Sequence, residues 1–115
     1  MSKKVMIVED HAGILEVLSV ILTRKGYDVV EENDGQRALD ELERTRFDVV
    51  VCDLMLDTLP GLEVIRRLRE RDKDVRIIAV SGKGQKYLDE AVRVGANASL
   101  PKPFTIKQVE QIIGG

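Results

Sequence analysis

The stretch Phe47-Asp48-Val49-Val50-Val51-Cys52-Asp53 decides the fold. Val49 to Cys52 form a continuous apolar run, and three of these residues are β-branched. Such a run is typical of a strand that is buried on both faces in the middle of a parallel sheet. It ends on Asp53, at the place where ligands bind in open α/β sheets. An Asp after a strand is also common as a turn residue or helix cap, so the rest of the chain must decide between these interpretations.

The composition predicts one globular domain. The chain has 115 residues, of which 43% are hydrophobic and only 3% aromatic, so aliphatic side chains must fill the core. The net charge of −2 with 33% charged residues describes an ordinary soluble surface, without the basic excess expected of a nucleic-acid-binding protein.

The same composition indicates a reducing compartment. Cys52 is the single cysteine and lies inside an apolar run, so the chain can form no internal disulfide. The apolar run 5–8 is far too short for a signal peptide, and no stretch approaches membrane-spanning length. We therefore expect a cytoplasmic protein without a membrane segment.

Strand and helix patterns alternate along the whole chain. Short apolar runs predict strands, and apolar residues three and four apart predict helices, with Val92 expected on a buried helix face and Ile106 at near-helical spacing with Val109 and Ile113. The expected strands are 4–8, 27–31, 47–53, 76–80 and 96–100, and the expected helices are 14–25, 36–46, 62–71, 83–94 and 105–113. This alternation predicts an α/β fold, a doubly wound parallel sheet with helices on both faces.

Polar side chains follow four of the five strands. Glu9 and Asp10 come after the first, Asp53 after the third, Ser81 after the fourth and Lys102 after the fifth. In a parallel sheet these strand ends share one edge, where three carboxylates would repel one another. A hard divalent cation such as Mg²⁺ relieves that repulsion, and a carboxylate can act as a nucleophile toward phosphorus. Lys102 and Ser81 would then meet the phosphoryl oxygens.

On these motifs the chain resembles the receiver domains of response regulators in two-component signalling. The marks are Glu9-Asp10, Asp34-Gly35, Asp53, Gly61, Ser81-Gly82 and Lys102-Pro103-Phe104. The resemblance covers the whole chain, residues 1–115, as a single receiver domain without an output domain. It implies a flavodoxin-like sheet with strand order 2-1-3-4-5.

The resemblance also implies roles for individual residues. Asp53 would accept a phosphoryl group from a phosphohistidine on a sensor histidine kinase or a histidine phosphotransfer protein. Asp10, Asp53 and the backbone carbonyl of Met55 would bind Mg²⁺, with Glu9 acting on the metal through water.

Lys102 would neutralise the phosphoryl oxygens, and Ser81 would donate a hydrogen bond to one of them. The peptide bond between Lys102 and Pro103 would be cis. The protein would be a signalling switch rather than an enzyme, with self-catalysed phosphorylation and dephosphorylation. Its output protein or domain would be a partner, and the chain would be a monomer or a phosphorylation-dependent dimer.

Two departures from the family pattern keep an alternative open. Ser99 stands where the family often has a switching aromatic, and Asp57 stands where it often has proline. A phosphate-independent, receiver-like interaction module is therefore the runner-up. A metal-dependent phosphatase with an aspartyl nucleophile fits less well, because it would need a second Asp where this chain has Met55. We expect His11 to cap the first helix rather than bind a ligand.

Overall fold

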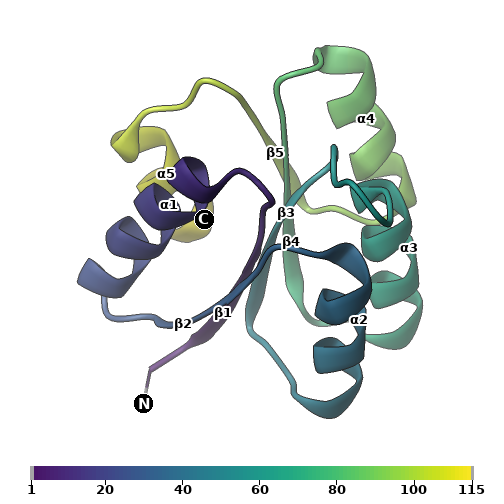
Figure 1. Ribbon diagram of the computed structural model, residues 1–115, viewed down its shortest axis with the longest axis horizontal. Coiled ribbons are helices and arrows are strands. Elements are labelled where there is room, and N and C mark those ends of the chain that lie inside the picture. Colours follow the sequence, from purple (N-terminus) through teal and green to yellow (C-terminus); the bar gives the residue numbers. More distant parts are fainter. Residues whose placement is uncertain (1, 115) are drawn as a thin grey trace.

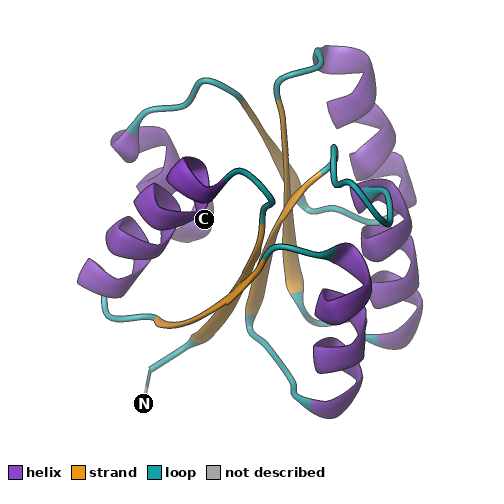
Figure 2. Cartoon of the chain, in the orientation of Figure 1, coloured by secondary structure: helices purple, strands orange, loops and turns teal. Residues whose placement is uncertain are grey.

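The computed structural model describes residues 2–114 and contains a five-stranded sheet with helices on both sides (Figures 1 and 2). Strands and helices alternate strictly, as the sequence predicts. In chain order they are β1 (Lys4–Val8), α1 (Ala12–Arg24), β2 (Asp28–Glu32), α2 (Gly35–Arg44), β3 (Val49–Asp53), α3 (Gly61–Arg71), β4 (Arg76–Ser81), α4 (Gln85–Val94), β5 (Ala98–Pro101) and α5 (Ile106–Gly114).

All neighbouring strands pair in parallel, in the order β2-β1-β3-β4-β5. Helices α1 and α5 cover one face of the sheet, and α2, α3 and α4 cover the other (Figure 1). The doubly wound, flavodoxin-like arrangement is therefore confirmed. β2 lies on one side of β1 and β3 on the other, so the strand order switches between β1 and β3, which is where such folds bind ligands.

β3 supplies side chains to both core layers, which explains its unbroken apolar sequence. Val50 and Cys52 pack with α2, α3 and α4, while Val49 and Val51 pack with α1 and α5. All residues of this strand are buried. The edge strand β2 carries acidic residues and is half-exposed instead. The central strand is thus fixed from both sides, and so is the position of the carboxylate at its end.

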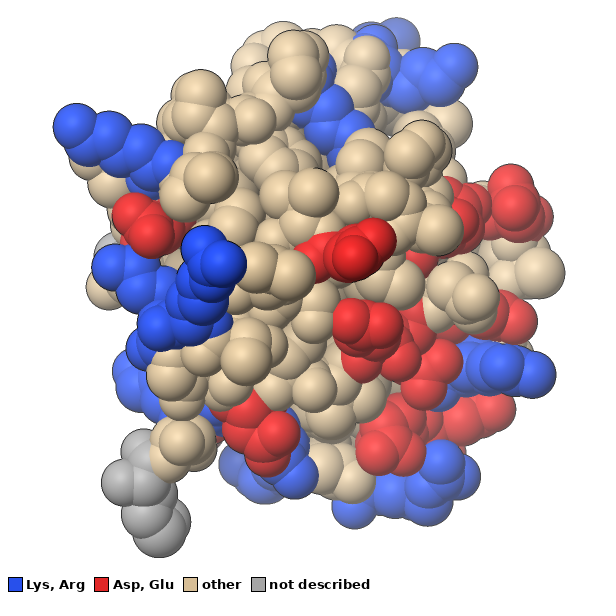
Figure 3. Space-filling view, turned by 60° about the vertical axis from the view of Figure 1, so that its left-hand side comes forward, with Lys and Arg blue, Asp and Glu red and all other residues tan. Residues whose placement is uncertain are grey.

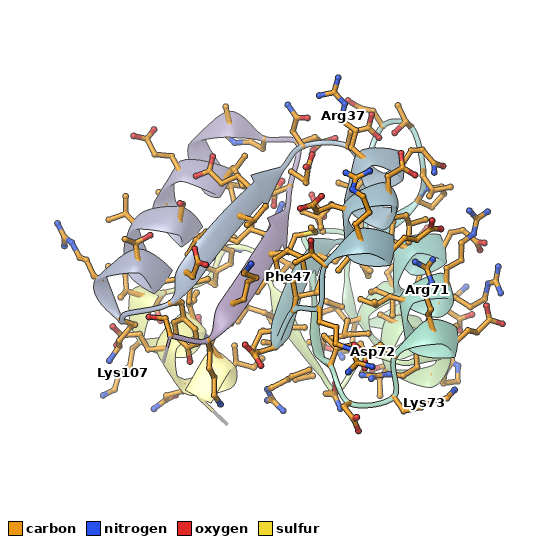
Figure 4. The ribbon with its side chains drawn as sticks, turned by 90° about the horizontal axis from the view of Figure 1, so that it is seen from below. Arg37, Phe47, Arg71, Asp72, Lys73 and Lys107 are labelled. Atoms are coloured by element: carbon orange, nitrogen blue, oxygen red, sulfur yellow. The ribbon has the colours of Figure 1, made fainter. Side chains whose placement is uncertain are left out.

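The amino ends of the strands form the edge of the sheet opposite the polar residues that end or follow β1, β3, β4 and β5. Phe47, just before β3, is buried there, and the ammonium of Lys4 lies 5.8 Å from the centre of its ring. Arg71, Asp72 and Lys73 lie at the end of α3 on this side (Figure 4).

One predicted core position, Val92, is wrong, and Ile106 at the start of the last helix is exposed as well. Val92 is 46% exposed and Ile106 is 60% exposed. Leu88 and Ala91 form the buried stripe of α4, and Val92 lies on the flank of that stripe. Ile106 is the first residue of α5 and lines an open groove against α1 instead of the sheet.

Within residues 2–114, no helix combines the length and apolar character needed to cross a bilayer.

Candidate functional site

The parallel sheet brings the predicted polar residues to one edge. Glu9 and Asp10 follow β1, Asp53 is the last residue of β3, Ser81 is the last residue of β4, and Lys102 follows β5. These four strands are consecutive neighbours in the sheet. Strand alternation and sheet order therefore place residues from four distant segments beside one another.

Lys102 and Asp53 form the centre of the site. The ammonium nitrogen of Lys102 lies 3.1 Å from Asp53 Oδ2 and 2.9 Å from Glu9 Oε1. Asp53 is 4% exposed and Glu9 only 1%. The other carboxylate oxygens accept backbone N–H bonds, from Met55 to Asp53 Oδ1 at 3.1 Å and from His11 to Glu9 Oε2 at 3.2 Å. Both buried carboxylates are thus held in fixed orientations.

Three carboxylates converge in a way that suits a hard cation. One oxygen each from Glu9, Asp10 and Asp53 can be chosen so that all three lie within 4.8 Å of one another. Glu9 Oε1 is buried and, apart from its ion pair with Lys102, has no hydrogen-bond partner among the described residues. Oxygen donors of this kind are the ligands that Mg²⁺ prefers, so the donor set fits that ion. On the face drawn in Figure 3, acidic side chains gather toward one side of the molecule.

Burial and mutual repulsion perturb the ionisation of these groups. Burial raises the pKa of Glu9, and Asp53 raises it further, although the contact with Lys102 opposes the shift. The pKa of Asp10 is raised by burial and then by the carboxylates of Asp57 and Asp53. For Lys102, burial acts to lower the pKa, but Glu9 and Asp53 outweigh it and the net shift is upward. The site therefore carries excess negative charge that a cation would neutralise.

Ser81 ends β4 and Lys102 directly follows β5, so both lie at the same edge of the sheet. The Ser81 hydroxyl is buried and accepts a hydrogen bond from Lys83 N–H at 3.0 Å, which leaves its own hydrogen free to donate. The peptide bond between Lys102 and Pro103 is cis. Lys102 N–H donates to the Ser81 carbonyl at 2.9 Å, so the two segments are joined directly.

The loop between β3 and α3, residues 54–60, lies against the site. Its two ends are closed by a bond from Gly61 N–H to the Leu54 carbonyl at 3.1 Å. A Cβ atom at Gly61 would lie 2.0 Å from the Asp53 carbonyl oxygen, so only glycine allows α3 to begin this close to β3. Met55 is 42% exposed, and Asp57 is exposed as well.

Other expectations concern residues around this edge. His11 is the N-cap of α1, and its Nδ1 accepts a hydrogen bond from Ile14 N–H at 3.3 Å, as predicted. Ser99 is half-buried in β5, opposite Ala79. Sequence reasoning missed a contact between Thr58, in the loop after β3, and Asp34, the N-cap of α2. No local pattern joins these two residues, although Asp34-Gly35 alone does signal a helix start.

A family model of the response regulator receiver domain matches residues 5–114. The chain belongs to the response-regulator receiver family. Similar receivers include the chemotaxis protein CheY of Thermotoga maritima, which is 30% identical over 115 residues that make up 98% of this chain and 96% of CheY. Sporulation initiation phosphotransferase F of Bacillus subtilis is 28% identical over 98% of this chain and 92% of its own length.

Some relatives are longer than this receiver. The transcriptional regulatory protein PhoP of alkaline phosphatase synthesis in Bacillus subtilis is 34% identical over 111 residues, which are 95% of this chain. The chain spans about half of that protein, 46% of its length.

Solved structures support the same fold. A CheY-like receiver from Methanospirillum hungatei superposes with a TM-score of 0.94 at 23% identity, covering 99% of this chain and 92% of that one. A response regulator from Burkholderia pseudomallei has a TM-score of 0.88 at 26% identity, covering 96% of this chain and 66% of that one. The Burkholderia structure contains a phosphorylated aspartic acid, a calcium ion and citrate.

Proposed function

We propose that this receiver is a phosphoryl-accepting signalling switch and that Asp53 is the phosphoacceptor. The observation that carries the proposal is the position of Asp53, which is almost fully buried with the Lys102 ammonium on one carboxylate oxygen and the Met55 N–H on the other. The phosphoryl donor would be a phosphohistidine on a sensor histidine kinase or a histidine phosphotransfer protein.

The transfer itself exchanges one bond to phosphorus for another. A carboxylate oxygen of Asp53 forms a bond to phosphorus as the P–N bond to the donor imidazole breaks, and the electron pair of that bond stays on the imidazole nitrogen. Asp53 needs no added proton for this step. The positive charge of Lys102, held 3.1 Å from Asp53 Oδ2, stabilises the phosphoryl oxygens as charge develops on them.

Mg²⁺ is the proposed cofactor of the switch. Asp10, Asp53 and the Met55 carbonyl would bind it directly, and Glu9 would act through water, which is consistent with the convergence of the three carboxylates. When bound, the ion would supply positive charge to the phosphoryl oxygens. The raised pKa values of Glu9 and Asp10 support the need for such a cation.

The output of the switch would pass through Ser81 and the surface around it. We propose that Ser81 donates its hydroxyl hydrogen to a phosphoryl oxygen and so reports phosphorylation to α4 and to a partner protein or domain. The chain would act as a monomer or a phosphorylation-dependent dimer, with self-catalysed phosphorylation and dephosphorylation. A cytoplasmic location is consistent with the free thiol of Cys52.

Intact mass after incubation with Mg²⁺ and acetyl phosphate tests the proposal. We expect a gain of about 80 Da, the mass of one phosphoryl group, on the wild-type chain. Asp53→Asn should abolish the gain, and omission of Mg²⁺ should greatly reduce it. The matched variant Asp57→Asn changes a neighbouring carboxylate and should still be phosphorylated. A gain that survives in Asp53→Asn would refute the assignment.

A second candidate is a phosphate-independent interaction module, which Ser99 favours because a serine cannot take the place of a switching aromatic. Failure of both acetyl phosphate and BeF₃⁻ to act on the wild-type chain would support this alternative. Binding of BeF₃⁻ with Mg²⁺ would instead support the switch.

A further inference from the structure

The loop of residues 54–60, here called the acid-facing loop, contains Met55, whose carbonyl is a proposed metal ligand, and follows Asp53 directly. Its backbone contacts the carboxylate of Asp53. The N–H of Met55 donates to Asp53 Oδ1 at 3.1 Å. The position of this loop therefore affects the orientation of the Asp53 carboxylate and of the Met55 carbonyl.

Apolar contacts fix only part of the loop. Leu54 and Leu56 are buried and Leu59 packs against the core, whereas Met55, Asp57 and Thr58 are exposed. Pro60 precedes α3 without a side-chain cap. The exposed side of the loop, which carries the groups that face the metal ligands, needs a separate attachment to the body of the protein.

That attachment is made by Thr58. Its hydroxyl donates to Asp34 Oδ1 at 2.7 Å, across 24 positions of sequence. The same oxygen accepts Gln36 N–H at 2.9 Å and caps α2, so the acceptor is itself held by a helix end. The hydrogen bond from Thr58 lowers the pKa of Asp34, which keeps the acceptor ionised and the bond charge-assisted.

The close approach of the two segments fits this attachment. A Cβ atom at Gly35, the first residue of α2, would lie 2.8 Å from the carbonyl oxygen of Leu59. The absence of a side chain at Gly35 therefore lets the loop backbone rest on the first turn of α2, beside the Asp34 carboxylate. Gly35 and Leu59, which make this close contact, each follow one of the two hydrogen-bonded residues, Asp34 and Thr58.

We propose that Thr58 is a positioning residue that fixes the acid-facing loop through Asp34 and thereby raises the affinity of the site for Mg²⁺. The inference rests on the proposed function, because it takes the Met55 carbonyl as a ligand of the ion. Without the Thr58 hydroxyl, the loop must be ordered when the ion binds, and the cost of that ordering weakens binding.

Mg²⁺ titration by isothermal calorimetry tests the proposal on the whole unphosphorylated chain. Thr58→Val, which keeps the shape but removes the hydroxyl, should raise the Kd for Mg²⁺ by about threefold to tenfold, the range of one net hydrogen bond. Thr58→Ser should restore affinity close to wild type. Thr45→Val makes the same change at the far end of α2, beyond the site, and should leave the Kd unchanged.

Hydrogen exchange of backbone amides supplies an independent measurement. The Met55 amide should exchange faster in Thr58→Val than in wild type and Thr58→Ser, while the amides of β3 keep their protection. An unchanged Kd in a folded Thr58→Val chain would overturn the positioning role and leave the proposed function intact. A wild-type chain that binds no Mg²⁺ would instead refute the metal site of the proposed function.

Discussion

Lys102 Nζ lies 3.1 Å from Asp53 Oδ2, so residues 49 positions apart in sequence form a charge-assisted contact at the edge of the sheet. The same ammonium lies 2.9 Å from Glu9 Oε1. One cation thus separates two buried carboxylates that would otherwise repel each other. This makes Lys102 important for stability as well as for the proposed phosphoryl transfer.

Replacement of Lys102 by methionine should therefore destabilise the chain. Lys102→Met keeps the apolar stem but leaves Glu9 and Asp53 without their cation, so we expect the unfolding free energy to fall by about 1–3 kcal/mol at neutral pH. Denaturant unfolding measures the change. Lys107→Met, on an exposed position of α5 (Figure 4), is the matched control and should have little effect. Equal stability of the two variants would contradict the prediction.

Glycine at position 61 is a packing requirement of the site. A Cβ atom there would lie 2.0 Å from the Asp53 carbonyl oxygen and 2.6 Å from Leu54 Cα. Both are backbone atoms, so no side-chain rotation can relieve the clash. Gly61→Ala should lower the unfolding free energy by about 2 kcal/mol or more. In Gly82→Ala the new atom would meet Lys102 Cβ at an ordinary 3.6 Å, so this control should change thermal unfolding only slightly.

Arg69 ties the end of α3 to the end of α4. Its guanidinium donates to the Gly95 carbonyl at 2.9 Å, the Asp72 carbonyl at 3.1 Å and Asn97 Oδ1 at 2.6 Å. The Asn97 oxygen also accepts Ile77 N–H of β4 at 2.8 Å. Arg69→Ala should cost about 1–3 kcal/mol of unfolding free energy and speed amide exchange at Ile77.

Arg66→Ala provides the comparison, because Arg66 pairs with the acidic side chains of Glu63 and Glu70 on the exposed side of the same helix. We expect this variant to lose less stability than Arg69→Ala, because solvent screens exposed ion pairs. If both arginine variants lose the same unfolding free energy, the hydrogen bonds from Arg69 to Gly95 and Asn97 stabilise the fold no more than an exposed ion pair does.

Glu63 should show a strongly acidic titration. Hydrogen bonds from Arg66 and then Arg67 lower its pKa from 4.5 to about 2. A lowered pKa means that the ionised form stabilises the fold above the unfolded value of 4.5 and that this contribution disappears as the pH falls toward 2. Carboxyl carbon NMR should find the midpoint near 2 in wild type and closer to 4.5 in an Arg66→Ala, Arg67→Ala double variant. A wild-type midpoint near 4.5 would show that these pairs are open in solution.

The sequence predicts the sheet well because each strand has its own local signal. The run Val49–Cys52 is apolar because β3 contributes to both core layers, and the half-exposed β2 is correspondingly mixed in composition. Polar residues directly after apolar runs fall at one edge by the geometry of parallel strands, which is why Glu9, Asp53 and Lys102 can be grouped from the order of residues alone.

Features that depend on contacts between distant segments could not be predicted. The Thr58–Asp34 bond joins two exposed polar residues whose local sequences signal only a turn and a helix cap. The predicted start of the fourth helix at Lys83 is two residues early, because Lys83 N–H bonds to the Ser81 hydroxyl and Gly84 adopts a φ of +114°. Residues 82–84 therefore form a turn beside Ser81 and not the first turn of α4.

Cys52 lies in the most protected strand, one residue before Asp53, with no exposed surface, and burial raises the pKa of its thiol. The thiol faces the layer of α2, α3 and α4, so it stays inert toward alkylating reagents until these helices move off this face of the sheet. As the chain has no other cysteine, its labelling rate reports opening of the contact between these helices and β3. The protein therefore contains a natural probe, and a slower labelling rate of Cys52 would measure the stabilising effect of Mg²⁺ or phosphorylation without an engineered dye.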